Sequence, residues 1–171
     1  MLWVKEGENM CDKFPNNMTI EAVFDRYCDT VYRLAFARTK NRFDAEDVLQ
    51  TVFMKLLKTE KVFSEEEHLK AWLLKVTVNS SKNLLTSAWM RLTEGMKDDI
   101  TAEIPEYTEV YPAVAALPSK YRTVIHLFYY EGYSVNEIAG ILDVKEATVK
   151  TRLARAREKL KVKLEGVELD V

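Results

Sequence analysis

The stretch GYSVNEIAGILDVKEATVKTRLARAREKLKVK, from Gly132 to Lys163, decides the fold of the C-terminal part of this chain. Ser134 and Glu137 have the S-x-x-E spacing of a capping box, which predicts that a helix starts there. A short turn at Asp143 and Val144 follows. The next segment repeats apolar residues every three or four positions, as an amphipathic helix does, and these are Val149, Leu153, Ala156 and Leu160. The sequence therefore predicts two helices joined by a tight turn.

The second of these helices is strongly basic in an otherwise acidic chain. From Val144 to Lys163 there are eight basic and two acidic residues, whereas the rest of the chain has 17 basic and 25 acidic residues. A cationic helix that follows a helix and a tight turn is typical of a helix-turn-helix that enters a DNA groove. The alternative is a solvated basic helix, but the capping box, the turn and the apolar stripe all favour the DNA-binding interpretation.

Composition predicts an all-α fold. It gives no support to a membrane protein, a secreted protein or a metalloprotein. Glycine occurs only five times, and alternating β-branched residues are absent. No apolar run approaches the roughly 18 residues of a membrane span, and the first residues lack a signal-peptide pattern, so we expect a cytoplasmic protein without membrane insertion. Cys11 and Cys28 have no CxxC spacing, and His68 and His126 are far apart in the sequence. We therefore expect no metal site and no cofactor.

Upstream of the helix-turn-helix, hydrophobic periodicity predicts two helical blocks. Residues 1–17 form a polar tail, and helices are expected at 18–39, at 45–58 with Asp44 as N-cap, and at 65–87 after a second S-x-x-E box at Ser64. Weak periodicity, acidic residues and Pro105 indicate a linker at 91–107. A further helix is expected at 120–131, with Ser119 as N-cap and Gly132 at its end. The expected domains are thus 18–90 and 108–171.

The helix expected at 45–58 has more apolar residues than one buried side can hold. Five of them share one side at 100° per residue, namely Ala45, Val48, Leu49, Val52 and Leu56. Three others, Phe53, Leu57 and Met54, lie progressively further from that side and are interleaved with Glu46, Asp47 and Gln50. Exposed apolar residues among carboxylates indicate a protein-docking face. A neighbouring helix that covers Phe53 and Leu57 explains the pattern equally well.

The helix expected at 65–87 has a polar face that includes Lys75, Asn79 and Lys82, spaced by four and three residues. Lysines with an amide between them suit contacts to a nucleic-acid backbone and a base edge. From the pattern alone, a simply solvated face is the favoured interpretation. Trp72, on another side of the same helix, is expected in the core.

Taken together, these motifs resemble bacterial RNA polymerase sigma factors of the extracytoplasmic-function (ECF) type. The matching stretches are VYRLAFARTKNRFDAEDVLQTVFMKL, HLKAWLLKVTVN and ALPSKYRTVIHLFYYEGYSVNEIAGILDVKEATVKTRLARAREKL, in the order and spacing of the family. The resemblance implies an initiation factor rather than an enzyme. Its partners would be the β and β′ subunits of core RNA polymerase, promoter DNA and an anti-sigma factor.

The resemblance also implies roles for particular residues. The N-terminal domain, similar to sigma region two, would dock on the polymerase through Asp44, Glu46, Asp47, Gln50, Phe53, Met54 and Leu57. It would also open the −10 element with the loop before Ser64 and with Lys75, Asn79 and Lys82. The C-terminal domain, similar to region four, would read the −35 element with Lys145, Thr148, Lys150, Thr151, Arg152 and Arg155.

Three departures from the family pattern bear on these roles. The stretch SSKNLLTSAWMR after Asn79 lacks the usual acidic residue and arginines, Asp143 stands where a turn glycine is usual, and Lys145 replaces a serine N-cap. Asp tolerates positive φ better than most residues, so we expect the turn to survive. The main alternative function is a stand-alone helix-turn-helix regulator, which would need a ligand or dimerisation domain in its N-terminal half. A nucleic-acid enzyme would need a carboxylate cluster or metal-ligand spacing.

Overall fold

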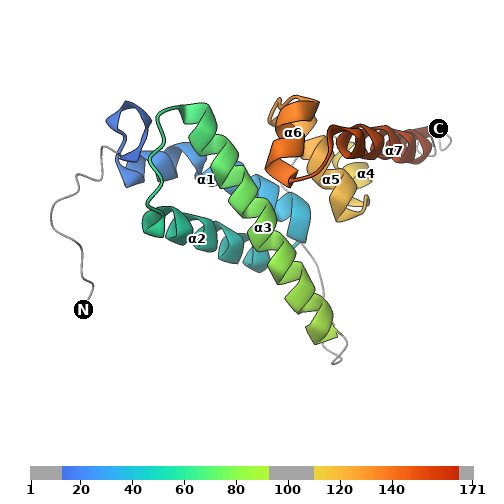
Figure 1. Cartoon of the computed structure of the whole chain (residues 1–171). Coiled ribbons are helices and arrows are strands. Elements are labelled where there is room, and N and C mark those ends of the chain that lie inside the picture. The colour runs from blue at the N-terminus through green and yellow to red at the C-terminus, as the bar shows by residue number, and fades with distance from the viewer. Residues whose placement is uncertain (1–12, 93–109, 166–171) are drawn as a thin grey trace.

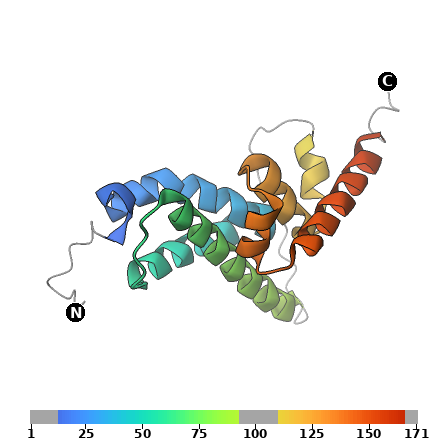
Figure 2. The same cartoon turned by 45° about the horizontal axis from the view of Figure 1, so that its top comes forward.

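The computed structural model describes residues 13–92 and 110–165, and the regular elements in these ranges are helices. In chain order they are η2 (Pro15–Asn17), α1 (Ile20–Thr39), α2 (Arg42–Lys58), α3 (Glu66–Leu92), α4 (Val110–Ala115), α5 (Ser119–Ile125), η3 (His126–Tyr130), α6 (Val135–Leu142) and α7 (Glu146–Glu165). Helices α1–α3 form one bundle, and α4–α7 form a second bundle beside it (Figures 1 and 2). This confirms the predicted all-α fold with two helical domains. No helix within the described ranges is long and apolar enough to cross a membrane.

The N-terminal bundle buries one side of each of its helices. The predicted stripe of α1 is buried at Val23, Tyr27 and Val31, although Phe24, on the same predicted stripe, is exposed. These side chains pack against apolar residues of α2 and α3, including Val48, Val52, Leu56, Leu69 and Leu73. Helix α3 continues past its predicted end at 87 into the first residues of the predicted linker. The rest of that linker lies outside the described residues.

The helix-turn-helix forms as its local sequence predicts. The Ser134 hydroxyl accepts a hydrogen bond from the Glu137 amide at 3.3 Å, and the Glu137 carboxylate accepts one from the Ser134 amide at 2.8 Å, which completes the capping box. Asp143 adopts φ 54° at the end of α6, so the turn survives without glycine. Three residues of the predicted α7 stripe, Val149, Leu153 and Ala156, are buried, and Leu160 packs against them.

The predicted role of Ser119 as an N-cap is wrong. Pro118 occupies the N-cap position, Ser119 is the first residue of α5, and its hydroxyl is buried without a hydrogen-bond partner. The side chain therefore lies one position too late to reach the free amides of the first turn. The helix continues beyond α5 as a π-helix and ends before Gly132, whose φ of +73° fits its predicted place at the helix end.

The hydrophobic core of the C-terminal bundle extends into the N-terminal one, which also has a separate core of its own. Leu34 of α1 and Leu74 and Val78 of α3 belong to the same buried cluster as Ile138 of α6 and Val149 of α7. Helix α6 lies against α3, and α5 lies against the end of α1 (Figure 1). The domains therefore pack against each other in a closed arrangement, which no sequence pattern predicted.

A buried arginine joins the domains at the end of α1. The Arg122 guanidinium, on α5, donates hydrogen bonds to the carbonyl oxygens of Ala37 at 2.5 Å and Arg38 at 3.0 Å, and also to that of Leu117. The last carbonyls of a helix have no partner within it, so Arg122 caps α1 from the other domain. Arg38 in turn donates to the Thr123 hydroxyl at 2.6 Å.

Polar contacts between α3 and the C-terminal domain border the same interface. Lys70 forms an ion pair with Glu131 at 2.8 Å, and the Lys75 ammonium donates to the Gly140 carbonyl at 3.4 Å. Burial acts to raise the pKa of Glu131, but hydrogen bonds from His126 and Lys70 outweigh it and lower the pKa. Glu131 therefore stays ionised as a partner for Lys70.

We expect Arg122→Ala to lower the free energy of unfolding by about 3 kcal/mol or more, because hydrogen bonds from a charged group contribute roughly 1.5–3 kcal/mol each. Urea denaturation of the full chain measures this change. Arg155→Ala, which removes an exposed arginine from the same domain, is the matched control and should change stability by less than about 0.5 kcal/mol. Equal effects of the two substitutions would contradict the role of Arg122.

Candidate functional site

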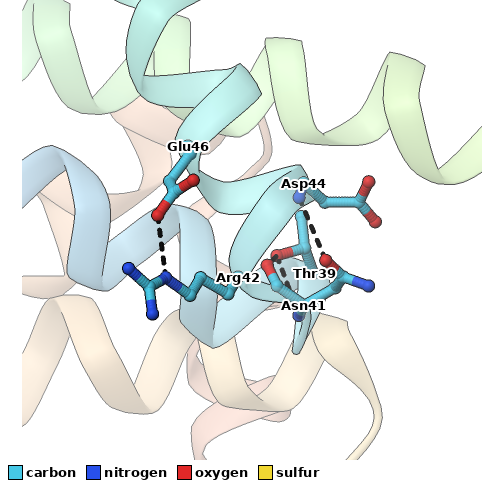
Figure 3. A network of polar contacts seen from close by, with 5 residues as sticks. All are labelled: Thr39, Asn41, Arg42, Asp44 and Glu46. Carbon is cyan, nitrogen blue, oxygen red and sulfur yellow. Dashed lines mark hydrogen bonds and ion pairs between the residues drawn. The ribbon is translucent and has the colours of Figure 1, made fainter. Parts of the chain in front are cut away.

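Helix α2 begins earlier than predicted, and a different residue caps it. Figure 3 shows Asn41 at the N-cap, where its side-chain oxygen accepts a hydrogen bond from the Asp44 amide at 3.1 Å. The prediction that Asp44 is the N-cap is therefore wrong, because Asn41 caps equally well and stands three residues earlier. Asp44 instead lies in the first turn, where the helix dipole favours a carboxylate. Arg42 pairs with Glu46 at 2.9 Å.

The side of α2 opposite the core is a continuous exposed face that mixes apolar and acidic residues. Phe43 is 77% exposed, Met54 46% and Leu57 44%. Exposed Glu46, Asp47 and Gln50 lie between them at the three- and four-residue steps that keep side chains on one helix face. We call Phe43, Glu46, Asp47, Gln50, Met54 and Leu57 the α2 face. Sequence reasoning missed Phe43 because the predicted helix began at residue 45.

Phe53 does not belong to this face, which corrects its expected exposure as a docking side chain. It is only 7% exposed, and its ring meets that of Phe24 on α1 edge to face, with centroids 4.8 Å apart. A neighbouring helix, α1, thus covers Phe53, which was the alternative explanation of the pattern. Leu57 remains exposed. The sequence signal for the burial of Phe53 is its place directly after the buried Val52, at the edge of the wide apolar side of α2.

The polar face of α3 lies beside the C-terminal domain. Lys75, Asn79 and Lys82 are all exposed, as the helical spacing predicted. Asn79 and Lys82 line a groove between the domains, whereas Lys75 reaches the end of α6. Trp72 is half-buried and packs edge to face on Phe63 at 5.5 Å, which confirms its expected place in the core.

Four of the six residues expected to read the −35 element lie together on α7. Thr148, Thr151, Arg152 and Arg155 line a hollow of about 350 Å³ with Lys120 and Tyr121 of α5. Sequence reasoning missed these last two residues, since only the tertiary fold places α5 beside α7. Lys145 is exposed immediately before α7.

Two other cations of α7 face elsewhere. Lys150 is outside this hollow and pairs with Glu146 at 3.9 Å. Arg157 donates to the Tyr129 hydroxyl at 2.9 Å and lies over the Phe128 ring. Arg157 therefore ties α7 to η3. Among the described residues, no group of three or more His, Cys, Asp or Glu could hold a metal ion.

Comparison with known families identifies both halves of the chain. Residues 23–91 match the model of sigma-70 region 2, and residues 107–160 match that of sigma-70 region 4. RNA polymerase sigma factor SigV of Bacillus subtilis is 32% identical over 81% of this chain and 86% of its own length. ECF RNA polymerase sigma factor SigM of Mycobacterium tuberculosis is 30% identical over 82% of this chain and 74% of its own. The chain belongs to the ECF sigma factors.

A solved structure has the same fold. The sigma factor RpoE of Bartonella quintana, in complex with the anti-sigma factor NepR, covers 88% of this chain and 98% of its own with a TM-score of 0.72 at 21% identity. As a member of the ECF family, the chain is an alternative sigma factor, and that family consists of transcription initiation factors. The region 2 match in the N-terminal half occupies the place where a stand-alone regulator would carry a ligand or dimerisation domain.

The burial of Phe53 leads to a stability prediction. Phe53→Ala should lower the free energy of unfolding by about 3 kcal/mol, because truncating a buried phenylalanine leaves a cavity. Met54→Ala, its exposed neighbour on the same helix, should cost less than about 1 kcal/mol. Urea denaturation of both variants is the measurement. A Met54→Ala variant as unstable as Phe53→Ala would mean that the α2 face is covered.

Proposed function

We propose that this sigma factor docks on core RNA polymerase through the α2 face and recognises promoters with its two domains, 18–90 and 108–171, joined by a linker at 91–107. The observation that carries the docking proposal is the solvent exposure of Phe43, Met54 and Leu57 beside the carboxylates of Glu46 and Asp47. Large exposed apolar side chains in a polar surround are typical of protein interfaces. The site of action would be the cytoplasm, with the polymerase.

In this proposal Lys75, Asn79 and Lys82 contact the −10 element, and α7 contacts the −35 element with Lys145 and its four clustered residues. In the closed arrangement, the two sets of residues cannot contact the −10 and −35 elements at the same time. Asn79 and Arg152 line the same groove, whereas the two promoter elements lie about 25 base pairs apart, or about 85 Å along B-DNA. Promoter binding therefore requires the domains to separate, and polymerase binding would supply the free energy for this change.

A protein inhibitor is a further proposed partner. RpoE was solved with the anti-sigma factor NepR, and CnrH, with a TM-score of 0.62, was solved with the cytosolic domain of CnrY. A partner that binds the closed arrangement more tightly than the open one would hold the two DNA-binding surfaces together. We propose that an anti-sigma factor acts on this chain in that way.

Phe43→Ala and Asp47→Ala should each weaken binding to core polymerase without lowering the thermal midpoint. Loss of an aromatic anchor at an interface costs about 2 kcal/mol or more, which is roughly 30-fold in affinity. Binding to purified core polymerase and thermal unfolding, measured on the same variants, test this. Val62→Ala removes an exposed apolar side chain outside α2 and should bind like the native chain. Native affinity in both α2 variants would refute the docking proposal.

The grouping on α7 predicts which cations read DNA sequence. Arg152, which lies with Thr148, Thr151 and Arg155, should contact base edges, where a bidentate arginine–guanine contact gives about 1–3 kcal/mol of discrimination. Lys150, on another side of the helix, should contact phosphates at most. Transcription from a library of −35 variants should therefore show altered base preference with Arg152→Ala and unchanged preference with Lys150→Ala. The reverse result would show that the opposite side of α7 reads the bases.

A further inference from the structure

The groove between the two domains gathers positive charge from both of them. It has a volume of about 690 Å³ and is lined by four cationic side chains: Arg38 from α1, Lys82 from α3, Lys120 from α5 and Arg152 from α7. Among the described residues that line it, Asp143 is the one acidic residue. The chain as a whole has a net charge of −2. The positive charge of this groove is therefore a local feature and does not follow from the overall composition.

One of these cations, Arg38, has no carboxylate partner among the described residues. The residue is only 9% exposed, and its guanidinium donates to a neutral hydroxyl, that of Thr123. Its Nε donor and the hydroxyl of Ser119, another residue of the groove, are buried without hydrogen-bond partners. Burial and the nearby charges of Arg122 and Arg152 lower the pKa of Arg38 to about 10. Buried cations without an anion are costly, so a bound anion would stabilise the closed arrangement.

We propose that this groove binds a small ligand with two or three linked phosphates, such as a nucleoside polyphosphate or free polyphosphate. Its volume lies within the roughly 300–1,000 Å³ of small-molecule sites. The guanidinium forks of Arg38 and Arg152 match phosphate oxygens, and lysines bind them as point charges. Cations from four helices suit a polyvalent ligand better than a single monovalent ion.

Such a ligand would act on the equilibrium between closed and open forms. It bridges Lys82 of the N-terminal domain and Lys120 of the C-terminal domain, and this bridge exists only while the domains are packed together. It also occupies Arg152, which the −35 element would need. The ligand therefore favours the closed arrangement and competes with promoter DNA. The binding itself requires neither polymerase nor promoter, so it can fail or succeed independently of the proposed function.

The test is calorimetric titration of the full chain with sodium tripolyphosphate at constant ionic strength, together with the thermal midpoint. We expect one saturable site and a midpoint that rises with ligand concentration. Lys82→Gln and Lys120→Gln should each weaken binding about tenfold, because each removes one charge-assisted contact. Lys159→Gln, an exposed lysine of α7 outside the groove, is the matched control and should change affinity less than about twofold.

A second titration with adenosine triphosphate distinguishes the two sources of the phosphates. Tighter binding than that of tripolyphosphate indicates a nucleoside ligand, and equal binding indicates free polyphosphate.

Three results would overturn the proposal. Equal losses from Lys159→Gln and Lys120→Gln would indicate diffuse attraction to basic helices. Native affinity in Lys82→Gln would show that the site does not span both domains. Tighter binding of an oligoglutamate peptide would indicate a site for an acidic protein segment instead.

Discussion

The Arg122 guanidinium at the end of α1 is the contact on which the closed arrangement depends. A buried cation is tolerated only when its donors find acceptors, and here these acceptors are carbonyl oxygens from two domains, those of Ala37 and Arg38 in α1 and that of Leu117 before α5. Both domains thus contribute acceptors to the side chain. The apolar cluster around Leu74 and Ile138 joins the same two domains.

The closed arrangement has an electrostatic consequence for DNA binding. It places the polar face of α3 and the recognition helix α7 on one groove, so that Lys82 and Arg152 share a small volume. Like charges held together in this way favour any change that separates them or supplies an anion. The α2 face, the proposed docking surface, contributes no residue to this groove, so polymerase bound there would leave the groove free to open. In the proposed function, the same residues would serve a closed state that cannot span a promoter and an open state that can.

Sequence predicted the features that depend on neighbours in the chain. The capping box of Ser134 and Glu137, the left-handed Asp143 and the buried stripe of α7 follow from local rules and were confirmed. Asn41 replaced Asp44 as N-cap because two good capping residues compete within one turn. The sequence pattern left open whether Phe53 is covered, and only the fold shows that Phe24, on another helix, covers it. The contact of Arg122 with α1 could not be predicted, since the carbonyls of Ala37 and Arg38 lie more than eighty residues away in the chain.

The central claim is that the free protein is closed and that core polymerase opens it. Energy transfer between two dyes tests this directly, with one dye at His68 in α3 and the other at Asn136 in α6, both exposed and near the contacts that join the domains, and with Cys11 and Cys28 replaced by serine. The structure predicts a single population with high transfer efficiency for the free chain, and a large fall in efficiency when core polymerase is added. Low efficiency in the free chain, or the same efficiency with and without polymerase, would contradict the account.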